Sequence, residues 1–214
     1  MIDYIWRING LDVFYTNETN GGGDHFAIEY IDIIKDRYGK KDHVLEWCSG
    51  PGFIGYGVYA SGLCNYISFN EFFLPAIEML EKTKKNSNSN DCISIHTENS
   101  LDAFSRQMPI DLVVGNPPHW SSIESAQPCF PFDIEAHYHV PEILIDFEWN
   151  AHKNLFLNMK ELLSVDGKIL LQENKQGSNP EVFESMIYDV DLKITGVAES
   201  HMYPDIYYLE VGHR

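Results

Sequence analysis

Two short segments of the sequence combine residue types that could do chemistry. In residues 46–55 an acid is followed by a loop that contains three glycines. In residues 116–120 an asparagine, two prolines, a histidine and a tryptophan follow an apolar run. A glycine loop lets a ligand approach the backbone closely, and a fixed side-chain amide can orient a reacting group. The two segments therefore predict a ligand-binding loop and a polar catalytic turn.

The glycine loop lies between a predicted strand and a predicted helix. Gly50 and Gly52 can turn the chain sharply because they have no Cβ. In a nucleotide-phosphate site, this arrangement would present an anion to the helix N-terminus. Glu46, the acid that closes the strand, would repel a phosphate and suits a cationic group, such as the α-amino group of a methionine moiety. We therefore expect Glu46, Gly50 and Gly52 to contact a cofactor of that kind.

Further polar residues follow the next two predicted strands. Glu71 closes the second strand, where its carboxylate can accept hydrogen bonds from two ribose hydroxyls; Asn70 could take this role if the register differs by one. Glu98 and Asn99 follow the third strand, where either could meet an adenine amino group. One carboxylate at a strand end is more often a turn or helix cap than a ligand. Acids at the ends of three successive strands, beside a glycine loop, favour a ligand site.

The catalytic turn ends an apolar strand over residues 110–115. Proline lacks an amide hydrogen and restricts the residue before it, so the strand stops at Asn116. The Asn116 side-chain carbonyl and the Pro117 main-chain carbonyl can then hold the two hydrogens of an amino group and stabilise the positive charge that develops on its nitrogen. His119 and Trp120 could each stack on a flat substrate or pack in the protein. The His119 imidazole could also accept a proton, but we favour stacking or packing.

These segments resemble two motifs of a known family. Residues 46–55 resemble the first motif of the class I S-adenosylmethionine-dependent methyltransferases, and residues 116–119 resemble their fourth motif in its Asn-Pro-Pro-aromatic form. The resemblance spans residues 40–213, approximately. Within the family, the sequence is similar to the release-factor glutamine methyltransferases and to the small-domain ribosomal RNA guanine-N2 methyltransferases. The family usually has Tyr or Phe where this chain has His119, a departure that leaves the acceptor open between an adenine, a glutamine amide and something smaller.

The resemblance implies S-adenosyl-L-methionine as the cofactor and a planar nitrogen as the methyl acceptor. It implies cofactor contacts, catalytic residues and substrate contacts as follows: for the cofactor Glu46, Gly50, Gly52, Glu71, Glu98, Asn99 and Asn116; for catalysis Asn116, Pro117 and His119; for the substrate His119 and Trp120.

From residue 43 onward, strand and helix patterns alternate. We expect strands near 43–47, 65–70, 91–96, 110–115, 167–173, 190–198 and 205–212, and helices near 53–61, 73–86, 141–164 and 179–188. The first 20 residues show no clear period, and a helix from about residue 26 ends near Gly39. We predict an α/β fold in one domain over 1–214. Its core is a Rossmann-like, doubly wound, seven-stranded sheet with a reversed last strand in a three-layer αβα arrangement, with an extension over 1–40 and a substrate loop over 119–140.

No metal site is expected. Cys48, Cys64, Cys92 and Cys129 have no CxxC spacing, which suits reduced thiols. The pair of histidines in residues 137–139 could supply two metal ligands, but histidine-rich loops are far more often unliganded.

Charge and hydropathy narrow the function classes. The sequence has 15 Lys and Arg against 32 Asp and Glu, a formal net charge of −17. That composition disfavours a grip on nucleic acid phosphates, so a protein or small-molecule substrate is preferred. The sequence shows no secretory signal and no long apolar run, so we expect a cytoplasmic protein with no membrane partner. Two alternatives stay open: an RNA or DNA base N-methyltransferase, which the Asn-Pro-Pro motif favours, and a non-catalytic S-adenosylmethionine-binding protein. The sequence leaves the oligomeric state open.

Overall fold

The computed structural model describes residues 3–19, 24–87, 90–97, 101, 104, 108–130 and 143–214. Contacts divide the chain into two compact units, Met1–Gly115 and Asn116–Arg214. The elements of the first unit are β1 (Tyr4–Ile8), β2 (Leu11–Tyr15), α1 (Asp24–Ile33), η1 (Ile34–Tyr38), β3 (Lys41–Trp47), α2 (Phe53–Ala60), β4 (Cys64–Asn70), α3 (Leu74–Asn86), η2 (Asn90–Cys92), β5 (Ile93–His96) and β6 (Ile110–Gly115). Those of the second are α4 (Ile123–Ala126), η3 (Gln127–Cys129), η5 (Phe147–Trp149), α6 (Asn150–Leu162), β7 (Leu163–Asn174), α7 (Pro180–Tyr188), β8 (Leu192–Glu199) and β9 (Ile206–His213).

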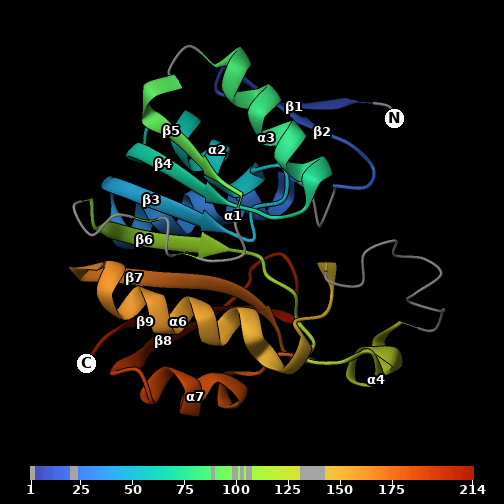
Figure 1. The fold of residues 1–214 in the computed structure, drawn as a ribbon, viewed down its shortest axis with the longest axis vertical. Helices are drawn as coiled ribbons and strands as arrows, with labels where there is room; N and C mark the ends of the chain where they lie inside the picture. The colour runs from blue at the N-terminus through green and yellow to red at the C-terminus, as the bar shows by residue number, and fades with distance from the viewer. Residues whose placement is uncertain are drawn as a thin grey trace. The chain divides into compact units, whose positions relative to one another are not determined.

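Seven strands form a mixed sheet in the order β5-β4-β3-β6-β7-β9-β8 (Figure 1). Strands β3 to β6 pair in parallel, whereas β9 pairs antiparallel with both β7 and β8. The order and directions confirm the predicted α/β class, a Rossmann-like sheet that ends in an antiparallel pair. The assignment of residues 1–214 to one domain stays a prediction.

The core of the first unit forms around β3, which is buried over its last five residues. A strand covered on both faces reads as a nearly continuous apolar run, and here His43 and Glu46 are the polar residues among the buried five. Helix α2 packs closely on α1, because Gly57 offers no side chain: a Cβ there would lie 3.2 Å from the Ile31 side chain. As predicted, Gly39 ends the first helical segment, with a φ of 65° and an N–H that donates to the Ile34 carbonyl.

An antiparallel β1–β2 hairpin precedes the first helix, where the sequence pattern showed no clear period. Its turn consists of Asn9 and Gly10, with φ values of 46° and 85°. Asn-Gly is the strongest short-range hairpin signal, because both central residues of the favoured turn need positive φ. The hairpin was therefore readable from the sequence. It packs on α2 through Trp6 and Tyr15, whose rings meet Phe53 edge-on.

In the second unit, α6 starts later than the predicted helix over 141–164. Residues Glu148 and Trp149 have φ values of 55° and 59°, which interrupt an α-helix before Asn150. The Asp146 carboxylate accepts the N–H groups of Ala151 and His152 and so satisfies two of the free donors of the new helix start. The prediction placed this start too early because it followed the apolar pattern and missed the acid that caps the helix.

The predicted substrate loop is only partly described. Within residues 119–130, Ser122 and Ser125 form a capping box for α4. The buried Trp120, Ala126 and Ile145 form a small apolar cluster. The remainder of the loop and the histidine pair in residues 137–139 lie outside the described residues.

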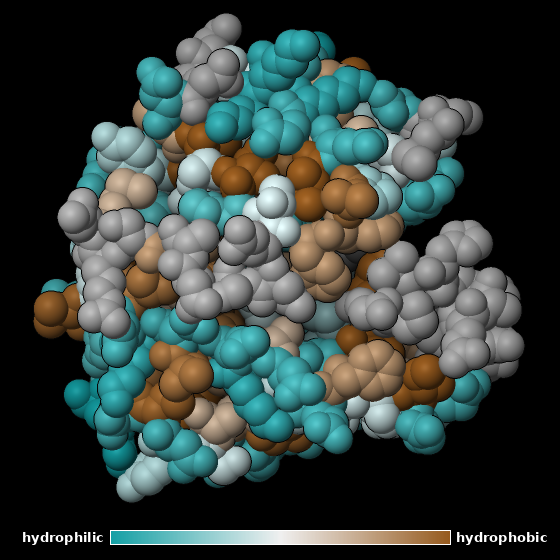
Figure 2. Space-filling model, viewed as in Figure 1, coloured by the Kyte–Doolittle hydropathy of each residue, from teal (hydrophilic) through white to brown (hydrophobic). Residues whose placement is uncertain are grey.

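Hydrophilic side chains cover much of the face shown in Figure 2, in keeping with the acidic composition. Over the described ranges, no helix is both long and apolar enough to cross a membrane.

Two leucines on α6 test the packing of the second unit. Leu155 is 0% exposed and Leu157 is 58% exposed. We expect Leu155→Ala to lower the free energy of unfolding by roughly 2–5 kcal/mol, because it leaves a cavity. The identical change at Leu157 should cost less than about 0.5 kcal/mol. Urea unfolding of both variants measures the difference, and equal losses would mean that α6 presents another face to the core.

Candidate functional site

The glycine loop has positive backbone φ angles at three positions, two of them glycines. Gly50 and Gly52 have φ values of 52° and 86°, in the left-handed region. At Gly52, a Cβ would lie 2.6 Å from the Tyr56 ring, so a larger residue would clash as well as strain the backbone. Cys48 also has a positive φ, 51°, although it is not a glycine. The loop thus turns from β3 into α2 through a sequence that permits little variation.

Glu46 ties the end of β3 to the start of α2. Its Oε2 accepts the N–H of Gly55 at 2.7 Å, and its Oε1 accepts the N–H of Ile54 at 3.3 Å. A Cβ on Gly55 would lie 2.7 Å from Oε2, so this glycine makes room for the acid. Burial raises the pKa of Glu46 to about 8, because the loss of hydration outweighs the two N–H groups.

Glu71 performs a similar task for the next strand. Its Oε2 accepts the N–H of Gly50 at 2.6 Å, and its Oε1 accepts the N–H groups of Phe72 and Phe73, each at 2.9 Å. Burial raises its pKa despite these three donors. The carboxylate therefore joins the glycine loop to the segment that leads into α3. The structure brings Glu46, Glu71 and both predicted loop glycines together, while Glu98 and Asn99 lie outside the described residues.

A buried hydroxyl in the loop leaves hydrogen-bonding capacity for a polar ligand. Ser49 is 5% exposed, and its Oγ has no hydrogen-bond partner among the described residues. A buried hydroxyl without a partner is costly, and native proteins rarely keep one. Its place beside Gly50, with two acids on neighbouring strand ends, fits a small polar cofactor such as S-adenosylmethionine.

The predicted catalytic turn follows the end of β6. Gly115, the last residue of β6, pairs in register with Trp47 at the end of β3, so the two parallel strands end at the same edge. The Tyr30 hydroxyl donates to the Gly115 carbonyl at 2.7 Å and fixes this end of the strand. Asn116 and Pro117 open the second unit, the former half-buried and the latter buried.

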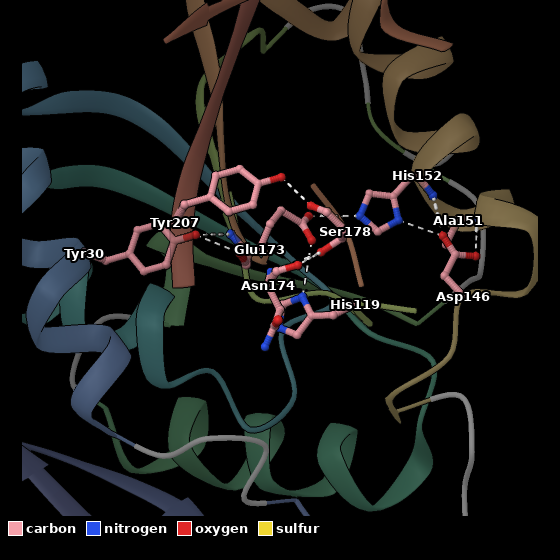
Figure 3. Close-up of polar contacts among 10 residues, drawn as sticks. Tyr30, His119, Asp146, Ala151, His152, Glu173, Asn174, Ser178 and Tyr207 are labelled. Atoms are coloured by element: carbon pink, nitrogen blue, oxygen red, sulfur yellow. Dashed lines mark hydrogen bonds and ion pairs between the residues drawn. The ribbon is translucent and has the colours of Figure 1, made fainter. Parts of the chain in front are cut away.

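His119 is the first member of a buried chain of alternating imidazoles and carboxylates (Figure 3). Its Nδ1 lies 3.2 Å from Glu173 Oε2, and Glu173 Oε1 lies 3.1 Å from His152 Nε2. His152 Nδ1 lies 2.7 Å from Asp146 Oδ2. Glu173 and His152 are both 0% exposed. The chain runs from the turn through β7 and α6 to the segment before η5.

The charges on Asp146, His152 and Glu173 stabilise one another. Burial opposes the charge on each group most strongly, but the hydrogen bonds and the opposite charges outweigh it. They raise the pKa of His152 to about 9 and lower the pKa values of Asp146 and Glu173. At neutral pH, His152 is therefore an imidazolium between two carboxylates.

A tight loop after β7 supports the turn. At Gly177, a Cβ would lie 2.2 Å from the His119 carbonyl oxygen and 2.5 Å from Trp120 Nε1, so only glycine fits. The Trp120 indole is buried, and its Nε1–H has no acceptor within the described part of the chain. The loop thus packs the two predicted substrate residues in place.

The sequence analysis did not bring Asp146, His152 and Glu173 together as site residues. A usable signal existed for His152, which precedes Leu155, Phe156 and Met159 on the buried stripe of α6. A histidine at such a position needs polar partners. Nothing in the spacing of the three residues indicates that they meet.

The sequence matches no protein-family model and no curated protein. Solved structures resemble it. For a glycopeptide N-methyltransferase complexed with S-adenosyl-L-methionine, identity is 11%, coverage is 88% of this chain and 94% of that chain, and the TM-score is 0.61. A ribosomal protein L11 methylase from Lactobacillus delbrueckii subsp. bulgaricus is 11% identical, with 90% of this chain and 80% of that chain covered and a TM-score of 0.60. A TehB-like methyltransferase from Corynebacterium glutamicum is 12% identical, with 87% of this chain and 88% of that chain covered and a TM-score of 0.57. The chain has the Rossmann-like fold of these S-adenosylmethionine-dependent methyltransferases.

The raised pKa of Glu46 predicts a pH dependence of stability. The folded protein keeps a proton that the unfolded chain loses above its ordinary pKa of 4.5, so this stabilisation is complete below pH 4.5 and is lost as the pH rises toward 8. Between pH 5 and pH 8, the free energy of unfolding of the wild type should fall by roughly 3 kcal/mol more than that of Glu46→Gln. Urea unfolding at both pH values measures this, with Glu184→Gln on the surface as the control. Superimposable pH dependences of wild type and Glu46→Gln would contradict it.

Proposed function

We propose that this chain is an S-adenosylmethionine-dependent methyltransferase that methylates a planar nitrogen of a protein side chain or small molecule. The observation that carries the proposal is the glycine loop, which Glu46 and Glu71 tie to two strand ends and which holds the unpartnered Ser49 hydroxyl. When bound, S-adenosylmethionine supplies a methyl group whose bond to sulfur breaks as the bond to the acceptor forms, with the electron pair staying on sulfur.

The residues of the loop have distinct roles in holding the cofactor. A carboxylate offers about four acceptor positions, of which Glu71 uses three for backbone N–H groups and Glu46 uses two. The remaining positions can accept from a ribose hydroxyl at Glu71 and from a cationic amino group at Glu46. Gly50 and Gly52 allow the ligand to lie against the backbone.

The turn residues act on the acceptor. The carbonyl groups of Asn116 and Pro117 hold the hydrogens of the acceptor nitrogen and stabilise its developing positive charge. Trp120 offers a buried N–H donor without a partner among the described residues. The preference for a protein or small-molecule acceptor rests on the charge of −17. The Asn-Pro-Pro turn favours an RNA or DNA base as the second candidate, and RNA binding that weakens steeply with salt would promote it.

Calorimetry tests the cofactor and the role of Glu46 together. A cation beside Glu46 favours the ionised carboxylate and lowers its pKa from about 8. Binding of S-adenosylmethionine at pH 7 should therefore release up to about one proton more from the wild type than from Glu46→Gln. Titrations in buffers of different ionisation enthalpy measure the proton count. Absence of binding to the wild type would refute the proposed cofactor, and equal proton counts would refute the contact with Glu46.

Asn116→Ala tests the catalytic turn. Removing one fixed acceptor of the transition state should lower turnover by roughly 10²–10³, a larger factor than the change in the Kd for S-adenosylmethionine, which Asn116 is also expected to contact. Asn154→Ala on the exposed face of α6 is the matched control and should leave turnover unchanged. Isotopically labelled methyl donor, incubated with cell extract and followed by mass spectrometry, identifies the acceptor. Unchanged turnover in Asn116→Ala would remove Asn116 from the mechanism.

A further inference from the structure

Both ring nitrogens of His152 face carboxylates. This arrangement fixes the protonation of the four hydrogen-bonded side chains from His119 to Asp146. Nδ1 lies against Asp146 and Nε2 against Glu173, at 2.7 and 3.1 Å. The pKa values of Asp146 and Glu173 are lowered, so both are ionised at neutral pH and can only accept hydrogen bonds. With both carboxylates as acceptors at these distances, both nitrogens of His152 carry hydrogens. His152 is therefore a donor in both directions, and Glu173 stays ionised although it is fully buried.

The ionised Glu173 in turn fixes the tautomer of His119. Glu173 Oε2 is 3.2 Å from His119 Nδ1 and can only accept there, so Nδ1 carries the hydrogen. In a neutral imidazole the other nitrogen then holds the lone pair. Among the described residues, none donates a hydrogen bond to His119 Nε2, and the Trp120 ring meets the imidazole edge-on at 5.8 Å between centroids.

The charged groups nearest to His119 belong to the same hydrogen-bonded series. Glu173 faces it from β7, and His152 and Asp146 stand behind Glu173 on α6 and before η5. Two carboxylates against one imidazolium leave one negative charge. Tyr207 on β9 donates to the Ser178 carbonyl, and burial raises its pKa, so it adds no charge. An imidazolium at His119 would thus pair with Glu173.

We propose that His119 accepts the proton that the methyl acceptor loses, and that Glu173, His152 and Asp146 position it for this task. This inference rests on the proposed methyltransferase function and deepens it. It assigns the acceptor to planar nitrogens that bear a hydrogen, as in an amide or a conjugated amino group, since a ring nitrogen without hydrogen needs no base. His119 is thereby more than a stacking ring in the place of the usual Tyr or Phe.

The proton balance is simple. The acceptor nitrogen forms its new bond with its lone pair and becomes positively charged. It then gives its hydrogen, as a proton, to His119 Nε2, and the electron pair of the N–H bond returns to nitrogen. The resulting imidazolium keeps its Nδ1–H on Glu173 and releases the Nε2 proton to water, which restores the starting tautomer.

Nitrogen NMR of the imidazole rings tests the chain without cofactor or activity. In protein labelled with ¹⁵N-histidine at pH 7, His119 should be the Nδ1–H tautomer and His152 doubly protonated. The His119 signals are those lost in His119→Phe, and the His152 signals are those that Asp146→Asn shifts. In Glu173→Gln, His152 should lose its charge; should that variant not fold, Asp146→Asn gives the same readout. An Nε2–H tautomer at His119, or a neutral His152, in the wild type would overturn the inference.

The pH profile of methyl transfer separates a base from a stacking ring. With the acceptor found in cell extract, the wild-type rate should fall at acidic pH over the range in which NMR shows His119 to titrate. His119→Phe keeps a ring and loses the base, so its rate should fall by roughly 10²-fold or more and lose this acidic limb. The control, His25→Gln on the exposed face of α1, should retain the wild-type profile. A wild-type rate and profile in His119→Phe would overturn the inference, whereas failure of S-adenosylmethionine binding in calorimetry would overturn the proposed function itself.

Discussion

A carboxylate that leaves water must find hydrogen-bond donors, and this constraint organises both units of the chain. Glu46 and Glu71 lie at the ends of β3 and β4, where each parallel strand turns toward a helix. The free N–H groups there are those of the glycine loop and of the following helix starts. The acids therefore bind the loop to the sheet, and the loop conformation depends on them as much as on its glycines.

The two units satisfy their buried acids in different ways, and the difference has chemical consequences. The partners of Glu46 are neutral amides, so burial dominates and raises its pKa to about 8. The partners of Glu173 include the imidazolium of His152, so its pKa is lowered. The first acid can respond to an approaching cation by releasing a proton. The second keeps its charge and provides a fixed field, which is what orienting a base requires.

Sequence patterns predicted the elements whose burial follows a regular period, and failed where single residues decide. The strands, the glycine loop and its acids were readable because parallel strands and a strand-turn-helix unit impose local patterns. The start of α6 was not, because it depends on positive φ at Glu148 and Trp149 and on the cap from Asp146. The β1–β2 hairpin has an Asn-Gly pair at its turn, which predicts a hairpin even though apolar and polar residues alternate only weakly along its strands. The series of hydrogen bonds from His119 through Glu173 and His152 to Asp146 depends on tertiary contacts between distant segments. A single sequence does not specify such contacts.

The departure at His119 and the acid at Glu173 explain each other. Phe at that position would leave Glu173 with His152 alone as a hydrogen-bond partner among the described residues, and one carboxylate oxygen would lose its donor in a buried site. An apolar residue in place of Glu173 would leave His119 free to take either tautomer. Since an unpaired buried carboxylate costs far more than an exposed one, the two residues constrain each other in this chain. The histidine thus matches the charges that surround it in this chain.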